Sequence, residues 1–405
     1  MENLNLYIKL FDGENLESIY ESNDTVNEFN PQKINEKYVK GEIRIITEQA
    51  RYPLPSIEDM VKSGKYNLNP DFQRRYRWSD EKKSKLIESF IINVPVPPIF
   101  LYEIEFAKYE VMDGLQRMTA INEFYKDNYK LQGLEQWKEL NGLRYSELPE
   151  KIKEGIDRRY LSSIVLLYET AKSAKEAQFM KQLVFERLNS GGEYLTPQET
   201  RNALYAGNLN KLCVKISSNS SFRKMWGIPE PTENRLFEDE LSDDLTKDEK
   251  YSKMQDVELV LRFFALRHIE FVEYTSLERY FDNFLSKGNS FSQDLLNKYE
   301  ELFNETIDLI YNIFEENAFN LFRQRNGKWI WYNRPTKAIY DPMMRVFSQN
   351  LHKKEVLISR KDKVLENLPE FYIANYSDFG GRSNNKNDII KRTKLFQEYI
   401  SKFLD

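Results

Sequence analysis

The chain has 405 residues, enough for two or three domains with substantial cores. Its 59 Lys+Arg and 64 Asp+Glu residues give a net charge of −5, so any contact with nucleic acid requires a local basic face. The single cysteine excludes an internal disulfide framework, no apolar run approaches the ~20 residues of a membrane span, and the first residues lack a secretion signal, so we expect a cytoplasmic protein without a membrane partner.

The first half of the chain alternates strand and helix signals. Residues 1–40 are polar, show few sustained patterns and are predicted to form an N-terminal arm. The following stretch, residues 41–210, is expected to be one small α+β domain. We predict strands over 41–47, 99–102, 109–112 and 162–168, and helices starting at Ser79, after Asp113 and at Ser173.

An arginine cluster precedes the first of these helices. Arg74, Arg75 and Arg77 alternate with aromatic residues between Phe72 and Trp78, and this segment contains no acid. Arginine among aromatic residues is typical of phosphate or base contacts, so Gln73, Arg74 and Arg77 are candidate nucleotide ligands. The alternative is a strand edge whose arginines pair with scattered carboxylates.

Residues 109–118 predict a strand, a tight turn and a helix in succession. An extended apolar run breaks at Asp113-Gly114, and the following helix carries Gln116 and Arg117 near its start. A helix start directs backbone N–H groups and the positive end of the helix dipole at one point, and arginine adds a planar donor fork. We therefore predict an anion site here, although Asp-Gly is also a common turn pair.

A second candidate segment lies at residues 185–203. A helix ends at Asn189, and after a glycine turn Thr196 and Glu199 form a capping box, which gives Glu199 a structural explanation. Asn189, Arg201 and Asn202 have no comparable structural role and are predicted to face a nucleotide.

Beyond about residue 210 the strand signals nearly vanish, and residues 211–405 are predicted to form an α-helical domain with an acidic linker near 230–250. Two of its segments could meet a ligand. The tryptophans of residues 328–332 are read as core residues. Residues 379–394 combine a glycine turn with basic residues, so they form either a surface loop and solvated helix or a DNA contact through Arg382, Lys386, Lys391 and Arg392.

Four ordered motifs over residues 45–210 resemble the GmrS-type domain of the GmrSD family, in the ParB/sulfiredoxin-like superfamily. They are Pro70-x-Phe72-Gln73-Arg74 with Trp78, Leu86-Ile87-Glu88-Ser89 leading to Pro95-Val96-Pro97-Pro98, Asp113-Gly114-Leu115-Gln116-Arg117, and Asn189-x-x-Gly192-x-x-Leu195-Thr196-x-x-Glu199. The third motif departs from the family, in which a glutamine usually stands at the position of Leu115.

The resemblance implies a small ParB/sulfiredoxin-like mixed sheet with helices, nucleotide binding that is often coupled to hydrolysis, and a role in recognising foreign or modified DNA. Many relatives also carry a His-Asn-His nuclease domain. Because that chemistry needs histidine as base and as metal ligand, His268 and His352 do not readily build it. A partner nuclease or effector protein is therefore expected.

These observations give a hypothesis for the site. Arg117 and Arg74 hold nucleoside triphosphate, Gly114 contributes backbone amides, Gln116 or Gln73 orients phosphate or water, and Asp113 binds Mg²⁺. The alternative is a noncatalytic, ParB-like DNA-binding adaptor that recruits an effector. Direct DNA cleavage by an unrecognised site is a third possibility.

Overall fold

The computed structural model describes residues 10–14, 30–40, 45–67, 78–167, 173–189, 195–230, 245, 248–272, 276–381 and 385–404. The chain divides into two compact units, residues 25–195 and residues 196–405 with 1–24. The division falls at residue 195 and not near 210, because helix α7 (Pro197–Leu204) contacts helices α12 and α13 of the second unit. None of the helices in the described part of the chain has both the length and the apolar character of a membrane span.

The unit of residues 25–195 contains a mixed five-stranded sheet with the order β1-β5-β3-β4-β2. Strands β3 and β5 run parallel, as do β2 and β4, whereas the β1–β5 and β3–β4 pairs are antiparallel. The strands are β1 (Thr47–Pro53), β2 (Tyr66–Asn67), β3 (Ile99–Glu105), β4 (Lys108–Asp113) and β5 (Tyr160–Leu166). The predicted strands at 99–102, 109–112 and 162–168 are thus confirmed, whereas the first strand begins at Thr47, where we expected it to end.

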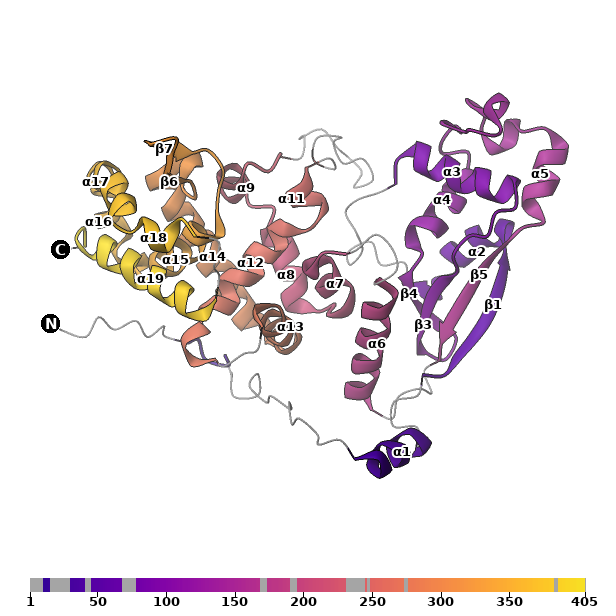
Figure 1. The fold of residues 1–405 in the computed structure, drawn as a ribbon, viewed down its shortest axis with the longest axis horizontal. Helices are drawn as coiled ribbons and strands as arrows, with labels where there is room; N and C mark the ends of the chain where they lie inside the picture. The colour runs from indigo at the N-terminus through magenta and orange to yellow at the C-terminus, as the bar shows by residue number, and fades with distance from the viewer. Residues whose placement is uncertain are drawn as a thin grey trace. The chain divides into compact units, whose positions relative to one another are not determined.

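Helices cover the sheet of this unit. They are α2 (Ile57–Lys62), α3 (Asp80–Ile91), α4 (Leu115–Tyr125), α5 (Glu150–Asp157) and α6 (Ala174–Asn189), while α1 (Pro31–Lys40) precedes the first strand. Alternate residues of the central strands, such as Ile99, Leu101 and Val111, form one hydrophobic core with α2, α3 and α4. Helix α6 lies beside β4 (Figure 1), where its Lys181 forms an ion pair of 2.7 Å with Glu110.

The sheet curls strongly. Strands β1 and β2 are its two edges, yet the ring of Tyr52 on β1 lies 6.2 Å from that of Tyr66 on β2. Tyr66 in turn stacks on Tyr109 of β4 at 5.2 Å between ring centroids. Burial and contact with Tyr52 raise the pKa of Tyr66 well above its ordinary value. The three rings therefore bring the two edges of the sheet together.

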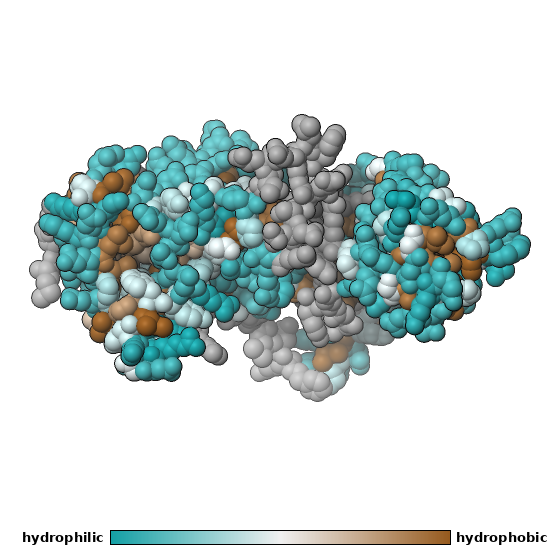
Figure 2. Space-filling model, turned by 90° about the horizontal axis from the view of Figure 1, so that it is seen from above, coloured by the Kyte–Doolittle hydropathy of each residue, from teal (hydrophilic) through white to brown (hydrophobic). Residues whose placement is uncertain are grey.

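The second unit is mainly helical. Its longer helices are α7 (Pro197–Leu204), α8 (Asn208–Ile216), α9 (Ser220–Trp226), α12 (Gln255–Leu266), α13 (Leu277–Gly288), α14 (Gln293–Phe314), α15 (Lys337–Gln349), α16 (Lys354–Ser359), α17 (Lys361–Ala374) and α19 (Lys386–Ser401). Two further short helices are α11 (Glu249–Ser252) and α18 (Tyr376–Phe379). One extensive hydrophobic core joins these helices except α7, which contacts α12 and α13. Hydrophilic residues cover most of the described surface seen in Figure 2. The predicted α+β fold followed by a helical region is confirmed.

One element of this unit was not expected. Strands β6 (Leu321–Arg325) and β7 (Lys328–Tyr332) form an antiparallel hairpin between α14 and α15. Its two-residue turn is Asn326-Gly327, and both residues have positive φ, of 52° and 77°. This sequence pair is a strong hairpin signal, because the favoured two-residue turn needs positive φ at both positions.

Candidate nucleotide site at the start of helix α4

The start of α4 is a sharp strand–turn–helix junction. Strand β4 ends at Asp113, Gly114 has a φ of 101°, and α4 begins at Leu115. A Cβ on Gly114 would lie 2.3 Å from Cγ2 of Ile99, so this position combines a glycine-type backbone with a close approach to β3. The predicted junction is therefore present, and the N–H groups of the first turn of α4 have no acceptor within the helix.

Arg117 is fixed at this junction by two oxygen atoms. Its Nη2 donates to Oδ2 of Asp113 at 2.7 Å and to the carbonyl oxygen of Pro98 at 3.2 Å. Its Nε is buried and has no hydrogen-bond partner among the described residues. Since the side chain is 14% exposed, one donor of an oriented guanidinium remains to be satisfied. Pro98 was not a predicted site residue, but it belongs to the proline motif that precedes β3 in the sequence.

Gln116 is also held in place. Its Oε1 accepts a hydrogen bond of 3.1 Å from the backbone N–H of Trp78, which lies just before α3. This contact joins the start of α4 to the end of the arginine-rich segment. Leu115 between them is partly buried and packs against the hydrophobic core, so it adds no polar atom to the site.

The other predicted ligands of this unit cannot be placed. Gln73, Arg74 and Arg77 lie outside the described residues, and so does the side chain of Asn189 at the end of α6. The convergence of Arg74 with Arg117 therefore stays a prediction.

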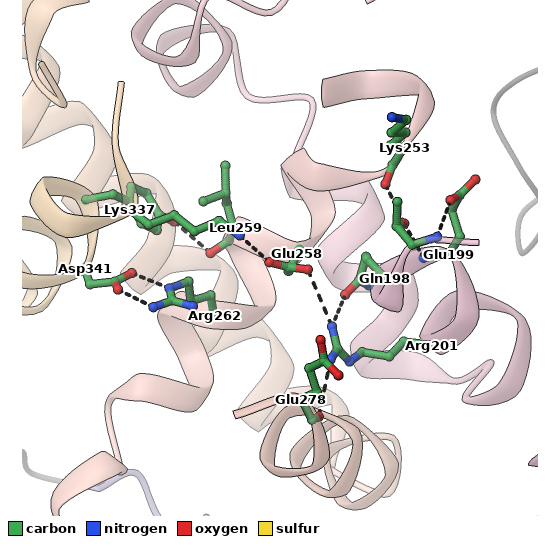
Figure 3. Close-up of polar contacts among 12 residues, drawn as sticks. Gln198, Glu199, Arg201, Lys253, Glu258, Leu259, Arg262, Glu278, Lys337 and Asp341 are labelled. Carbon is green, nitrogen blue, oxygen red and sulfur yellow. Dashed lines mark hydrogen bonds and ion pairs between the residues drawn. The ribbon is translucent and has the colours of Figure 1, made fainter. Parts of the chain in front are cut away.

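Arg201 and Asn202 belong to the helical unit, where both are buried. Arg201 Nε donates to Oδ1 of Asp282 at 2.7 Å, and its Nη1 lies 3.7 Å from Oε2 of Glu258. Figure 3 shows this guanidinium among side chains of α7, α12 and α13. Asn202 accepts a hydrogen bond of 2.8 Å from Asn210. The expectation that these residues have no structural role is wrong, because Arg201 binds carboxylates of other helices and Asn202 is hydrogen-bonded to another amide. The capping box of Thr196 and Glu199, in contrast, is confirmed.

The four residues near α19 that were predicted to contact DNA differ from one another in exposure and in contacts. Arg382 lies outside the described residues. Lys386 Nζ donates to the carbonyl of Val272 at 2.6 Å, and Lys391 is exposed and paired with Asp378 at 2.5 Å. Arg392 is 1% exposed, and burial lowers its pKa. A role for Arg392 in direct DNA contact would require its removal from the core, so its observed place is structural.

The exposed carboxylate of Asp113 is the candidate metal ligand of this site. Among the described residues, no group of three or more His, Cys, Asp or Glu side chains could hold a metal ion. Asp113 is 51% exposed, and only its Oδ2 is engaged by Arg117. Mg²⁺ commonly takes one or two carboxylates and fills its remaining positions with water and phosphate oxygens. Asp113 therefore fits Mg²⁺ that arrives with a nucleotide.

His268 is a buried structural residue of the helical unit. Its Nε2 lies 2.7 Å from Oε1 of Glu14, and neither side chain is exposed. Glu14 Oε1 also accepts hydrogen bonds from Tyr299 at 2.5 Å and from Arg267 at 3.2 Å. A part of the predicted N-terminal arm is thus anchored in the core. His352, the other histidine, is exposed.

This buried pair predicts loss of stability in acid. Burial lowers the pKa of His268 below its ordinary 6.5. Burial alone would raise the pKa of Glu14, but the hydrogen bond from His268 and the charge of Arg267 lower it below 4.5. Both groups bind protons more readily in the unfolded chain, so the free energy of unfolding falls as the pH drops below about 6.5 and falls further below about 4.5.

Thermal denaturation at pH 7.5, 6.0 and 5.0 measures this effect. His268→Gln should weaken the dependence between pH 7.5 and 5.0, whereas the exposed matched control His352→Gln should keep it. An unchanged dependence in His268→Gln would assign the acid sensitivity to other groups.

The arrangement above is that of an α+β domain in which helix α4 begins directly after strand β4 of a mixed sheet. Residues 57–206 match the family model described as GmrSD restriction endonuclease, N-terminal domain, which confirms the resemblance seen in the sequence motifs. No curated protein and no solved structure matches the chain. The match indicates that the chain is a component of a restriction or defence system.

Proposed function

We propose that the start of α4 binds the phosphates of a nucleoside triphosphate and that the chain is a nucleotide-dependent component of a DNA restriction or defence system. The observation that carries this proposal is the oriented guanidinium of Arg117, whose buried Nε has no hydrogen-bond partner in the part of the chain that the structure describes. It lies in the first turn of α4, where backbone N–H groups and the helix dipole also favour an anion. The family match supports the link to restriction and to DNA.

The same geometry can support hydrolysis of the bound nucleotide. Phosphoryl transfer to water depends on positioning and charge neutralisation, with water forming the new P–O bond as the bond to the leaving diphosphate breaks. Arg117 would neutralise charge on the phosphate oxygens, and Gln116, held through Trp78, would orient phosphate or water. Mg²⁺ held by Asp113, when bound with the nucleotide, would supply further charge neutralisation.

A noncatalytic role is the second candidate. Leu115 packs into the core and gives the site no polar group where the family usually has glutamine. This observation favours a nucleotide-responsive DNA-binding adaptor that binds without turnover and recruits an effector protein. Release of inorganic phosphate by the wild-type chain would exclude it.

Substitution of Arg117 should weaken nucleotide binding. Loss of a charged hydrogen-bond donor costs about 1.5–3 kcal/mol, so we expect Arg117→Ala to raise the Kd for triphosphate by about 10- to 150-fold. Arg117→Lys keeps the charge but loses the planar fork, so its effect should be smaller. Calorimetric titration with each of the four common triphosphates, with and without Mg²⁺, measures this change.

Arg158→Ala is the matched control. Arg158 is an exposed arginine in the same unit, at the end of α5, and it should bind nucleotide as the wild type does. The proposal fails when the wild-type chain binds none of the four triphosphates, or when Arg117→Ala binds them as tightly as Arg158→Ala does.

A further inference from the structure

The β6–β7 hairpin has one face fixed to the helical unit. Phe322, Trp329 and Trp331 share this face, and the ring of Phe322 lies 5.8 and 5.1 Å from those of the two tryptophans. Trp329 packs edge-on against Tyr376, and Trp331 against Tyr372, at 5.2 and 6.0 Å. Figure 1 shows the hairpin beside α17, which it contacts through β6. The sequence expectation that these tryptophans pack is therefore correct for this face, although Trp331 remains 43% exposed.

The opposite face carries cations. Residues in register across two strands point to the same side, and Arg325 pairs with Lys328 while Arg323 pairs with Ile330. Arg325 and Lys328 are exposed at the turn, and Ile330 is 38% exposed. Leu321, at the start of β6, shares this face and is buried in the core, whereas the two cations next to the turn, Arg325 and Lys328, are exposed.

The hairpin sequence itself supplies no carboxylate, and the charge of Arg334, which lies beyond β7, helps to lower the pKa of Glu249. Residues 321–334 contain four cations, Arg323, Arg325, Lys328 and Arg334, and no acidic residue, in a chain whose net charge is −5. None of the four forms an ion pair with a carboxylate that the structure describes. The Arg323 guanidinium lies 4.2 Å above the ring of Tyr332, and its buried Nε has no hydrogen-bond partner within the described residues. The face that carries Arg323, Arg325 and Lys328 is thus positively charged and can bind an anionic partner.

We propose that the cationic face of the β6–β7 hairpin, formed by Arg323, Arg325 and Lys328, binds the phosphate backbone of duplex DNA. Arginines two residues apart on one strand are about 6.6–6.8 Å apart, and a two-stranded ribbon is narrow enough to enter the major groove. The site lies outside the matched residues 57–206. The choice of DNA over an acidic protein rests on the proposed function.

The test is DNA binding by the full chain with a hairpin double variant. Arg325→Ala/Lys328→Ala removes the two exposed cations next to the hairpin turn. Arg279→Ala/Lys211→Ala is the matched control, because it removes one exposed arginine of α13 and one exposed lysine of α8 in the same unit. Fluorescence anisotropy of a labelled 30-base-pair duplex at several salt concentrations gives the Kd, and circular dichroism and thermal melting verify the fold.

We expect the hairpin variant to bind duplex at least about fivefold more weakly at low salt and to lower the slope of log K against log salt by about 2, one for each lost phosphate contact. The control variant should match the wild type. Equal binding by the two variants, or absence of duplex binding by the wild type, overturns the proposal. Tighter wild-type binding to an acidic peptide than to duplex also overturns it in favour of a protein partner.

These results are separable from those for the nucleotide site. The hairpin variant should bind triphosphate normally, and Arg117→Ala should bind duplex normally in the absence of nucleotide. Failure of the hairpin proposal therefore leaves the α4 site intact, and loss of nucleotide binding alone leaves the hairpin proposal intact.

Discussion

Glu14→Ala should lower the free energy of unfolding of the helical unit by about 3–5 kcal/mol, the usual effect of removing one partner from a buried ion pair. The carboxylate of Glu14 is not exposed, and its Oε1 is contacted by Arg267, His268 and Tyr299. Its Oε2 accepts the backbone N–H of Phe11 at 2.7 Å. The substitution leaves the guanidinium of Arg267, which is 3% exposed, without its carboxylate.

Packing adds to this effect. The Arg267 guanidinium lies 4.7 Å from the ring centre of Phe11 and 5.4 Å from that of Tyr299. Because the charge is placed between two rings by its contact with Glu14, loss of the carboxylate should also release residues 10–14 from the core. Urea denaturation followed by tryptophan fluorescence measures the stability, and hydrogen exchange in α12 and α14 localises the loss.

Two variants separate charge from size at this position. Glu14→Gln keeps the shape and one carbonyl acceptor, so it should lose less stability than Glu14→Ala. Asp12→Ala removes an exposed carboxylate from the same segment and should stay within about 0.5 kcal/mol of wild type. Equal stability of Glu14→Ala and Asp12→Ala would show that residues 10–14 do not stabilise the helical unit.

The contact of Glu14 illustrates what the sequence could not predict. Glu14 is 253 residues from Arg267 and 285 from Tyr299 along the chain, and no local pattern encodes such a pairing. The same reason explains Arg201. It looked free for a ligand because its carboxylate partner, Asp282, comes from a helix 81 residues away.

Local signals were much more reliable. Ser79 caps α3 by accepting from the N–H of Lys82, and Thr196 caps α7 in the predicted box with Glu199. The apolar periodicity of α14 and the apolar run that forms β3 are also patterns of residues close together in the sequence, so they could be recognised without the structure. The hairpin was missed because its alternation is aromatic and basic, with only one face packed, and the Asn326-Gly327 turn was the signal available.

The candidate site was predictable for a related reason. Asp113, Gly114, Gln116 and Arg117 are neighbours in sequence, so the junction that orders them is encoded locally. The contacts of Arg117 with Pro98 and of Gln116 with Trp78 depend on how three elements pack together, so neither could be predicted from neighbouring residues.

Gly114→Ala should be the most damaging single substitution at the candidate site. The left-handed backbone costs a non-glycine residue about 1–3 kcal/mol, and overpacking a core costs about 1–3 kcal/mol more. The added methyl would lie 2.3 Å from Cγ2 of Ile99, 2.8 Å from its Cβ and 3.1 Å from its Cα. Since Ile99 is fully buried on β3, it cannot move away without shifting the strand.

Gly142→Ala is the control that isolates the clash. Gly142 also has a positive φ, of 89°, but a Cβ there meets no atom of the described residues within 4 Å, so this variant carries the backbone strain alone. Urea denaturation should therefore rank stability as wild type, Gly142→Ala, Gly114→Ala in decreasing order. Gly114→Ala should also lose nucleotide binding under conditions in which it remains folded, because any shift of β3 relative to α4 displaces the Pro98 carbonyl that orients Arg117. Equal losses in the two alanine variants would mean that the junction tolerates the methyl group and that the close approach of α4 to β3 does not hold the site.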